Sequence, residues 1–211
     1  MHKFSFGIFF FVVIIFSACA SGSNQVNSLE HENIIEPVIN LVEVNKYSEY
    51  FVDINSYSTN GDFYQKKYEK EIISIVASLI ENHEMEIFKN SAGFYFDKKA
   101  NIRNRLYLGF DFETVKDNNL DYGRYSTFLI KENVAVIMDE VFRLSRILNE
   151  EEVAGLVIGF KWQDGRSNSL VNIWIKKEDM ILARELKITI NEMYQRSTIT
   201  NNEGKIILLP I

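Results

Sequence analysis

The sequence predicts an α+β fold, in which two long helices pack on one face of a mostly antiparallel sheet. Two segments repeat apolar residues at spacings of three and four, which is the pattern of an amphipathic helix. Shorter segments alternate apolar and polar residues, as strands do when one face of the sheet is buried. The helical and extended segments do not alternate regularly along the chain, and this favours α+β over a parallel βαβ fold.

The two helices are predicted over residues 63–88 and 126–148, with Asp62 and Ser126 as candidate N-caps. The apolar stripe of the first helix contains Tyr68, Ile72, Ile75, Val76, Leu79, Ile80, His83 and Ile87. The stripe of the second helix contains Ile130, Val134, Ile137, Val141, Leu144 and Leu148. We therefore expect both helices to bury one side against the sheet.

Extended structure is predicted for most of the remaining segments. Residues 94–96 begin a strand, and residues 106–113 alternate strictly. Residues 153–162 and 170–176 flank Asp164-Gly165 and predict a hairpin with a loop somewhat longer than two residues. A second short pair is expected at 180–183 and 187–190, and a terminal hairpin at 198–200 and 205–209. Thr189 and Glu192 have the spacing of a capping box, which predicts a short helix through Arg196.

The N-terminal segment 4–19 has the layout of an export signal. A short basic start precedes an apolar run that is too short to cross a bilayer as a helix, and small residues follow it. The tetrapeptide Phe16-Ser17-Ala18-Cys19 resembles the lipobox of bacterial lipoproteins, with Phe16 at the position where leucine is usual. The resemblance implies that residues 1–18 are a signal peptide and that Cys19 is lipidated and becomes the mature N-terminus.

This cleavage would leave a flexible tether at residues 19–35, which are small and polar, and a single α+β domain at residues 36–211. Cys19 is the only cysteine in the chain, so a disulfide framework is excluded and lipidation would consume the thiol. We expect an exported protein that is lipid-anchored to the bacterial cell membrane or outer membrane, in the periplasm or at the cell surface.

Charge and motifs exclude several function classes. The formal net charge is −6 and no basic stripe is present, which argues against a nucleic-acid partner. The chain lacks a glycine-rich phosphate motif and a nucleophile elbow, so no cofactor is expected. Of the three histidines, His2 and His31 fall in the signal peptide and tether, which leaves no zinc ligand set. His83 lies on the first helical stripe and is expected to be a partly buried packing residue.

Two groups of acidic residues are weak candidates for chemistry. Asp117, Asn119 and Asp121 have the spacing of the first ligands of an EF-hand loop, but the turn glycine of that loop is missing. We therefore expect a solvated loop there. Asp111 and Glu113 share one strand face and could flank a glycosidic bond together with a third acid. Because they alternate with phenylalanines, they match the ordinary solvent-facing side of a strand, and we do not expect catalysis there.

Trp174 is the first of four candidate binding residues. Strand alternation places it opposite the apolar face of its hairpin. Because Gly155 and Gly159 have no side chains, the indole could lie against bare backbone and form a shallow contact site, of the kind in which tryptophan is enriched. The alternative is a tryptophan covered by another segment of the chain. The candidate binding residues are Trp174, Gly159, Lys161 and Asn172.

Together these features favour a membrane-anchored envelope lipoprotein with a non-catalytic binding or structural role, acting on an envelope protein partner. One alternative is a carrier of an apolar ligand such as lipid, which requires a dry cavity between the sheet and the helices. A carboxylate-based hydrolase is a further alternative, and it requires two acids that converge in a cleft.

Overall fold

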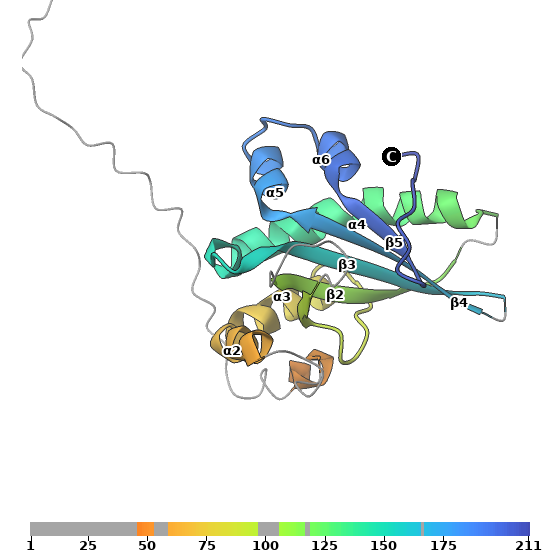
Figure 1. Cartoon of the computed structure of the whole chain (residues 1–211). Helices are drawn as coiled ribbons and strands as arrows, with labels where there is room; N and C mark the ends of the chain where they lie inside the picture. Colours follow the sequence, from red (N-terminus) through yellow and green to blue (C-terminus); the bar gives the residue numbers. More distant parts are fainter. Residues whose placement is uncertain (1–45, 53–58, 97–105, 117–118, 166) are drawn as a thin grey trace, which may run out of the picture. The chain divides into compact units, whose positions relative to one another are not determined.

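The computed structural model describes residues 46–52, 59–96, 106–116, 119–165 and 167–211 (Figure 1). The predicted signal peptide, the tether and Cys19 lie outside the described residues, as does Asp117. The elements follow in this order: η1 (Ser48–Tyr50), α2 (Thr59–Lys67), α3 (Glu69–Glu81), β1 (Gly93–Phe96), β2 (Leu106–Thr114), α4 (Tyr122–Leu144), η3 (Ile147–Asn149), β3 (Val153–Asp164), β4 (Ser167–Lys176), α5 (Lys177–Arg184), α6 (Ile190–Arg196) and β5 (Thr198–Asn201).

Within the described part of the chain, five strands form one sheet in the order β1-β2-β3-β4-β5. The pairs β1–β2, β3–β4 and β4–β5 are antiparallel, and β2–β3 is parallel. The fold is therefore α+β with a mostly antiparallel sheet, as predicted. The parallel pair was not predicted, and it exists because α4 returns the chain to the starting end of β2 before β3 begins, which makes a βαβ crossover.

One face of the sheet and the two long helices share a single hydrophobic core. The sheet contributes alternate residues of β2, β3 and β4, among them Leu108, Ile158 and Ile173, each fully buried. The predicted stripe of α4 is buried along its whole length, and Figure 1 shows this helix running along the sheet. Helices α5 and α6 add further buried side chains to the same core. The opposite face of the sheet, which we call the outer face, is left for other contacts.

The first predicted helix is shorter than expected. It is interrupted at Tyr68, which separates α2 from α3, and it ends at Glu81 instead of residue 88. The segment after it is extended, because it pairs with the part of β2 that β1 does not reach: the Phe88 N–H donates to the Asp111 carbonyl at 2.8 Å. Asp62 lies inside α2 and is not its N-cap.

The second predicted helix begins earlier than expected. Asp121 is its N-cap and accepts a hydrogen bond from the Arg124 N–H at 2.9 Å, whereas Ser126 is buried inside the helix. The helix ends at Leu144, and Leu148 of the predicted stripe is buried from the 3-10 turn that follows. A side chain five residues upstream of the predicted cap thus accounts for the N-terminus, because Asp is as good a cap as Ser.

The C-terminal third agrees with prediction except at one pair of strands and one loop. Residues 180–183 belong to helix α5, where Met180 and Ala183 are buried at helical spacing, so the predicted short strand pair is wrong. The capping box of Thr189 and Glu192 at the start of α6 is confirmed. The β3–β4 hairpin is also confirmed, but Asp164 pairs with Ser167, so its loop has two residues and is tighter than predicted. After β5, the chain turns back along that strand: a bridge joins Thr200 to Ile206, and the Ile207 N–H donates to the Ile199 carbonyl at 2.9 Å.

Candidate functional site

The outer face of the sheet carries all four candidate binding residues. The register places Asn172 opposite Gly159, and Trp174 opposite Val157 on the neighbouring strand. Lys161 follows two residues after Gly159 on β3 and therefore shares this face. The sheet thus brings Gly159, Lys161 and Asn172 together on one surface, with Trp174 two residues further along β4.

Trp174 is a half-buried packing residue of this face. Its ring meets Tyr107 edge-on, with 5.2 Å between centroids, and it covers a small cluster that includes Val157. The predicted contact between the indole and the two glycines is wrong. A side chain at Gly155 would stand 1.9 Å from the Ile175 carbonyl oxygen, so the β4 backbone fills that space.

The space above Gly159 is filled by polar side chains instead. A Cβ atom at this position would lie 2.2 Å from Asp111 Oδ1 and 2.7 Å from Asn172 Oδ1. Asp111 Oδ2 in turn accepts a hydrogen bond from Lys161 Nζ at 2.5 Å, and that ammonium lies 4.6 Å from the centroid of the Phe88 ring. The missing side chain at Gly159 therefore lets Asp111 reach across β3, where it holds and neutralises Lys161.

A hollow of ≈ 500 Å³ opens on the outer face where β3 and β4 meet their turn, and we call it the β3–β4 hollow. Its volume falls in the range of small-molecule sites. Its wall combines polar and apolar groups: one ammonium, one carboxylate, one hydroxyl, carboxamides, two aromatic residues and one aliphatic residue. The residues that line it are Phe88, Glu113, Lys161, Trp162, Gln163, Asn168, Ser169, Leu170 and Asn202. Of the four predicted residues, only Lys161 lines it. The hollow can hydrogen-bond a polar ligand through both donors and acceptors.

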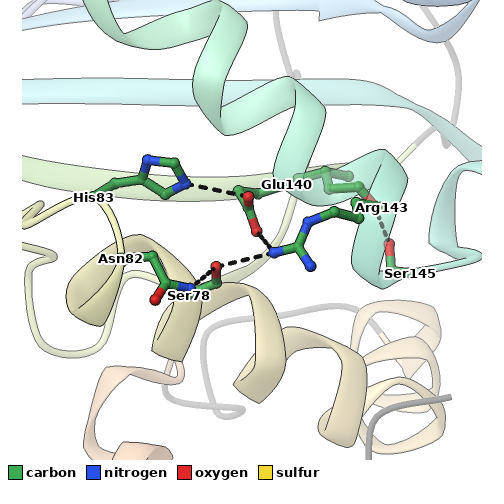
Figure 2. Close-up of polar contacts among 7 residues, drawn as sticks. Ser78, Asn82, His83, Glu140, Arg143 and Ser145 are labelled. Atoms are coloured by element: carbon green, nitrogen blue, oxygen red, sulfur yellow. Dashed lines mark hydrogen bonds and ion pairs between the residues drawn. The ribbon is translucent and has the colours of Figure 1, made fainter. Parts of the chain in front are cut away.

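A second polar cluster joins the end of α3 to α4 (Figure 2). His83 Nε2 lies 3.2 Å from Glu140 Oε1, and the other carboxylate oxygen of Glu140 accepts a hydrogen bond from Arg143. Arg143 also donates to Ser78 Oγ at 3.2 Å, and Asn82 donates to the same oxygen at 2.9 Å. His83 is partly buried, with 32% of its side chain exposed, but it lies beyond the C-terminus of α3 and not on the helix.

Glu140 is the buried charge of this cluster, with 10% of its side chain exposed. Burial alone would raise its pKa, but hydrogen bonds from Arg143, Ser78 and His83 outweigh burial and lower the pKa of the carboxyl group. A hollow of ≈ 280 Å³ lies beside His83 and shares Glu113 with the β3–β4 hollow. The cluster therefore ties α3 to α4 electrostatically while one edge of the imidazole stays accessible.

The other acidic candidates have structural partners. Asp111 is engaged by Lys161, and Asp121 caps α4, so neither is held ready for a proton transfer. Among the described residues, no group of three or more His, Cys, Asp or Glu side chains is placed to hold a metal ion.

Sequence reasoning did not find Glu140, Phe88 or Asn202. Glu140 had a detectable signal, because it is a charged residue between Ile137 and Val141 on the apolar stripe of α4. Phe88 and Asn202 had none, since each reaches the outer face through pairing between segments that are distant in the sequence.

No protein-family model, curated protein or solved structure matches this chain. In the part of the chain that the structure describes, no helix has the length and apolar character needed to span a bilayer.

Proposed function

We propose that this protein is a bacterial envelope lipoprotein, anchored to the membrane through lipid on Cys19, with a non-catalytic binding role. The anchor is supported by the apolar segment at residues 4–16 and by Ser17-Ala18-Cys19, which resemble a lipoprotein signal. It is also supported by the absence of any second cysteine. Several acyl chains would hold the protein at the membrane firmly, whereas a net charge of −6 disfavours attachment to anionic lipid by charge.

The binding role is supported chiefly by the β3–β4 hollow on the outer face. The hollow presents hydrogen-bonding groups to solvent. Its lysine, Lys161, is held by an ion pair with Asp111 and by contact with the Phe88 ring. Such fixed polar groups orient a ligand without a large loss of side-chain entropy. The wall carries an ammonium and a carboxylate beside its apolar residues, and these charged groups favour a partner with polar groups over the purely apolar ligand of the carrier alternative. The pairing of Asp111 with Lys161 likewise favours binding over acid–base hydrolysis.

Site-specific photocrosslinking in intact cells tests the binding role. A photoreactive residue replaces Gln163, which is exposed and lines the hollow, and the matched control replaces Lys131, which is exposed on α4. We expect a defined crosslinked product from position 163 and none from position 131. Equal products, or none from either position, would contradict a binding site at the hollow.

Trp174→Ala provides a second arm of the same experiment. The variant loses the edge-on contact with Tyr107, worth about 0.5–1.5 kcal/mol beyond the burial of the half-buried ring. It should still fold, because Trp174 lies outside the main hydrophobic core. If the partner extends over the outer face, the variant should weaken partner capture by about 2 kcal/mol, as truncation of an interface tryptophan does. A variant that unfolds would show that Trp174 is mainly structural.

A further inference from the structure

We propose that the partner of the outer face is an extended peptide, which adds as a strand to the free edge of β4 beside the β3–β4 hollow. This inference rests on the proposed binding function and specifies the chemistry of the partner. Strand addition of this kind derives its affinity from main-chain hydrogen bonds and its selectivity from pockets that receive alternate side chains.

Strand β4 is longer than the strand that covers it. It spans Ser167–Lys176, whereas β5 pairs only with the stretch from Val171 to Trp174. On the other side, β3 pairs with β4 along its whole length. The first four residues of β4 therefore have a ladder on one side and no strand on the other, among the residues described.

Side chains stand in for the missing strand at this edge. The Leu170 N–H donates to Asn202 Oδ1, and Asn202 Nδ2 donates to the Asn168 carbonyl at 2.6 Å. One carboxamide thus makes the two hydrogen bonds that the N–H and C=O of a single residue in a neighbouring parallel strand would make. The Tyr122 hydroxyl donates to the Leu170 carbonyl at 2.9 Å. The Asn168 N–H points to the same side, and no partner for it is found among the described residues.

The Asn202 carboxamide can leave this position without unfolding its turn. The turn is held by Asn201, whose side chain accepts hydrogen bonds from the N–H groups of Glu203 and Lys205. The Gly204 N–H donates to the Asn201 carbonyl at 2.8 Å, with Gly204 at a φ of 65°. In the absence of a partner, the Asn202 side chain therefore makes the hydrogen bonds of the β4 edge, and an incoming strand can replace this side chain.

The hollow lies where the side chains of an added strand would project. Asn168 and Leu170 share the outer face and both line the hollow. In an antiparallel or parallel pair, residues opposite each other share a face, so alternate side chains of the peptide would enter the hollow. Lys161 and Glu113 on the wall favour a peptide with polar residues at two positions that are two residues apart.

The test starts from a random peptide library selected on the full chain in detergent. The affinity of the selected peptides is then measured for Asn168→Pro and for the matched control Asn168→Ala. Proline removes the N–H that points to the open edge and leaves the hydrogen bonds to β3 untouched, whereas alanine keeps the N–H. We expect the peptide affinity of Asn168→Pro to be at least about tenfold lower than that of Asn168→Ala. The proline variant loses at least one main-chain hydrogen bond to the peptide and disturbs the geometry of the strand.

Asn202→Ala should have the opposite effect. The substitution frees the edge in the unbound protein and leaves the bound state unchanged. Affinity for the peptide should therefore rise about fivefold, because the one or two hydrogen bonds of the Asn202 carboxamide no longer compete with the peptide. Peptides that are N-methylated at alternate residues should lose binding in one register only, and this result does not depend on whether Asn168→Pro folds.

Three results would overturn strand addition: no selected peptide, equal affinities for the two Asn168 variants, or indifference to N-methylation. Equal affinities combined with crosslinking at Gln163 would leave the proposed binding function standing. A chain that dimerises in solution, and becomes monomeric in Asn168→Pro, would show that the edge receives a second copy and not a separate peptide.

Discussion

Glu140→Gln removes the buried charge that links α3 to α4 and keeps the shape of the side chain. Glu140 is 7% exposed as a residue, and its carboxylate contacts Arg143 and His83. Hydrogen bonds to charged groups contribute about 1.5–3 kcal/mol. Half of the Arg143 side chain is exposed, at 49%, so its unpaired charge would be solvated and the loss would be smaller. We expect a loss of about 1–2 kcal/mol in the free energy of unfolding at pH 7.

The effect should depend on pH in a defined direction. The pKa of Glu140 is lowered in the folded state, because the hydrogen bonds outweigh burial. The unfolded chain has an ordinary glutamate, with a pKa of about 4.3. The stabilisation by the Glu140 charge is therefore fully present above that pH and is lost as the pH falls through the lower folded pKa. Below the lowered folded pKa the wild-type side chain is neutral in both the folded and the unfolded state, and its advantage over glutamine should shrink towards zero.

Urea denaturation at pH 7 and at several pH values below 4.5 measures both effects. The matched control is Glu132→Gln, an exposed glutamate on the same helix, which should change stability by less than about 0.5 kcal/mol. Equal midpoints for the two variants at pH 7 would refute the role assigned to Glu140. A difference from wild type that persists undiminished at low pH would refute its electrostatic origin.

Two further predictions concern the core and the outer face. Ile75→Ala and Ile137→Ala should each destabilise the fold by about 2–5 kcal/mol, because both side chains are fully buried in the shared core. Thermal melting curves that match the wild type would contradict that assignment. Gly159→Ala should displace Asp111 and release Lys161, because the new Cβ would overlap the Asp111 carboxylate. The Lys161 ammonium resonances report the pairing by NMR, and spectra identical to those of wild type would contradict it.

The sequence was sufficient for the elements whose pattern is set by one buried face. The stripe of α4 correctly predicted burial at Ile130, Val134, Ile137, Val141 and Leu144, because a helix against a core repeats its contacts every turn. Met138 and Glu140 of the same helix are also buried and were not predicted. The alternation of β3 and β4 predicted the hairpin for the equivalent reason.

Other features depend on contacts between distant segments. The first helix ends at Glu81 because the following residues pair with β2. The sequence around Glu81 contains no pattern that predicts this pairing. The four apolar residues from Met180 to Ala183 are too short a run to distinguish a strand from a helix, and burial of Met180 and Ala183 against the core decides for the helix. The β2–β3 pair is parallel because of the crossover through α4, which periodicity does not encode.

The candidate site was predictable as a face but not as a hollow. Alternation sufficed to place Trp174, Asn172 and Lys161 on the side opposite the core. The hollow also needs Phe88 and Asn202, which reach it from other segments through backbone pairing and a side-chain carboxamide. Such convergence follows from the register of the sheet, which the sequence alone does not determine.

Metabolic labelling with a fatty acid tests directly whether the protein is anchored through lipid on Cys19. The wild-type chain and Cys19→Ala are expressed in a bacterial host, and label and mass are compared. We expect label on a processed wild-type protein, and an unlabelled precursor for Cys19→Ala that keeps residues 1–18. Because the chain has no other cysteine, label retained in Cys19→Ala, or an unlabelled wild-type protein at precursor mass, would contradict the account.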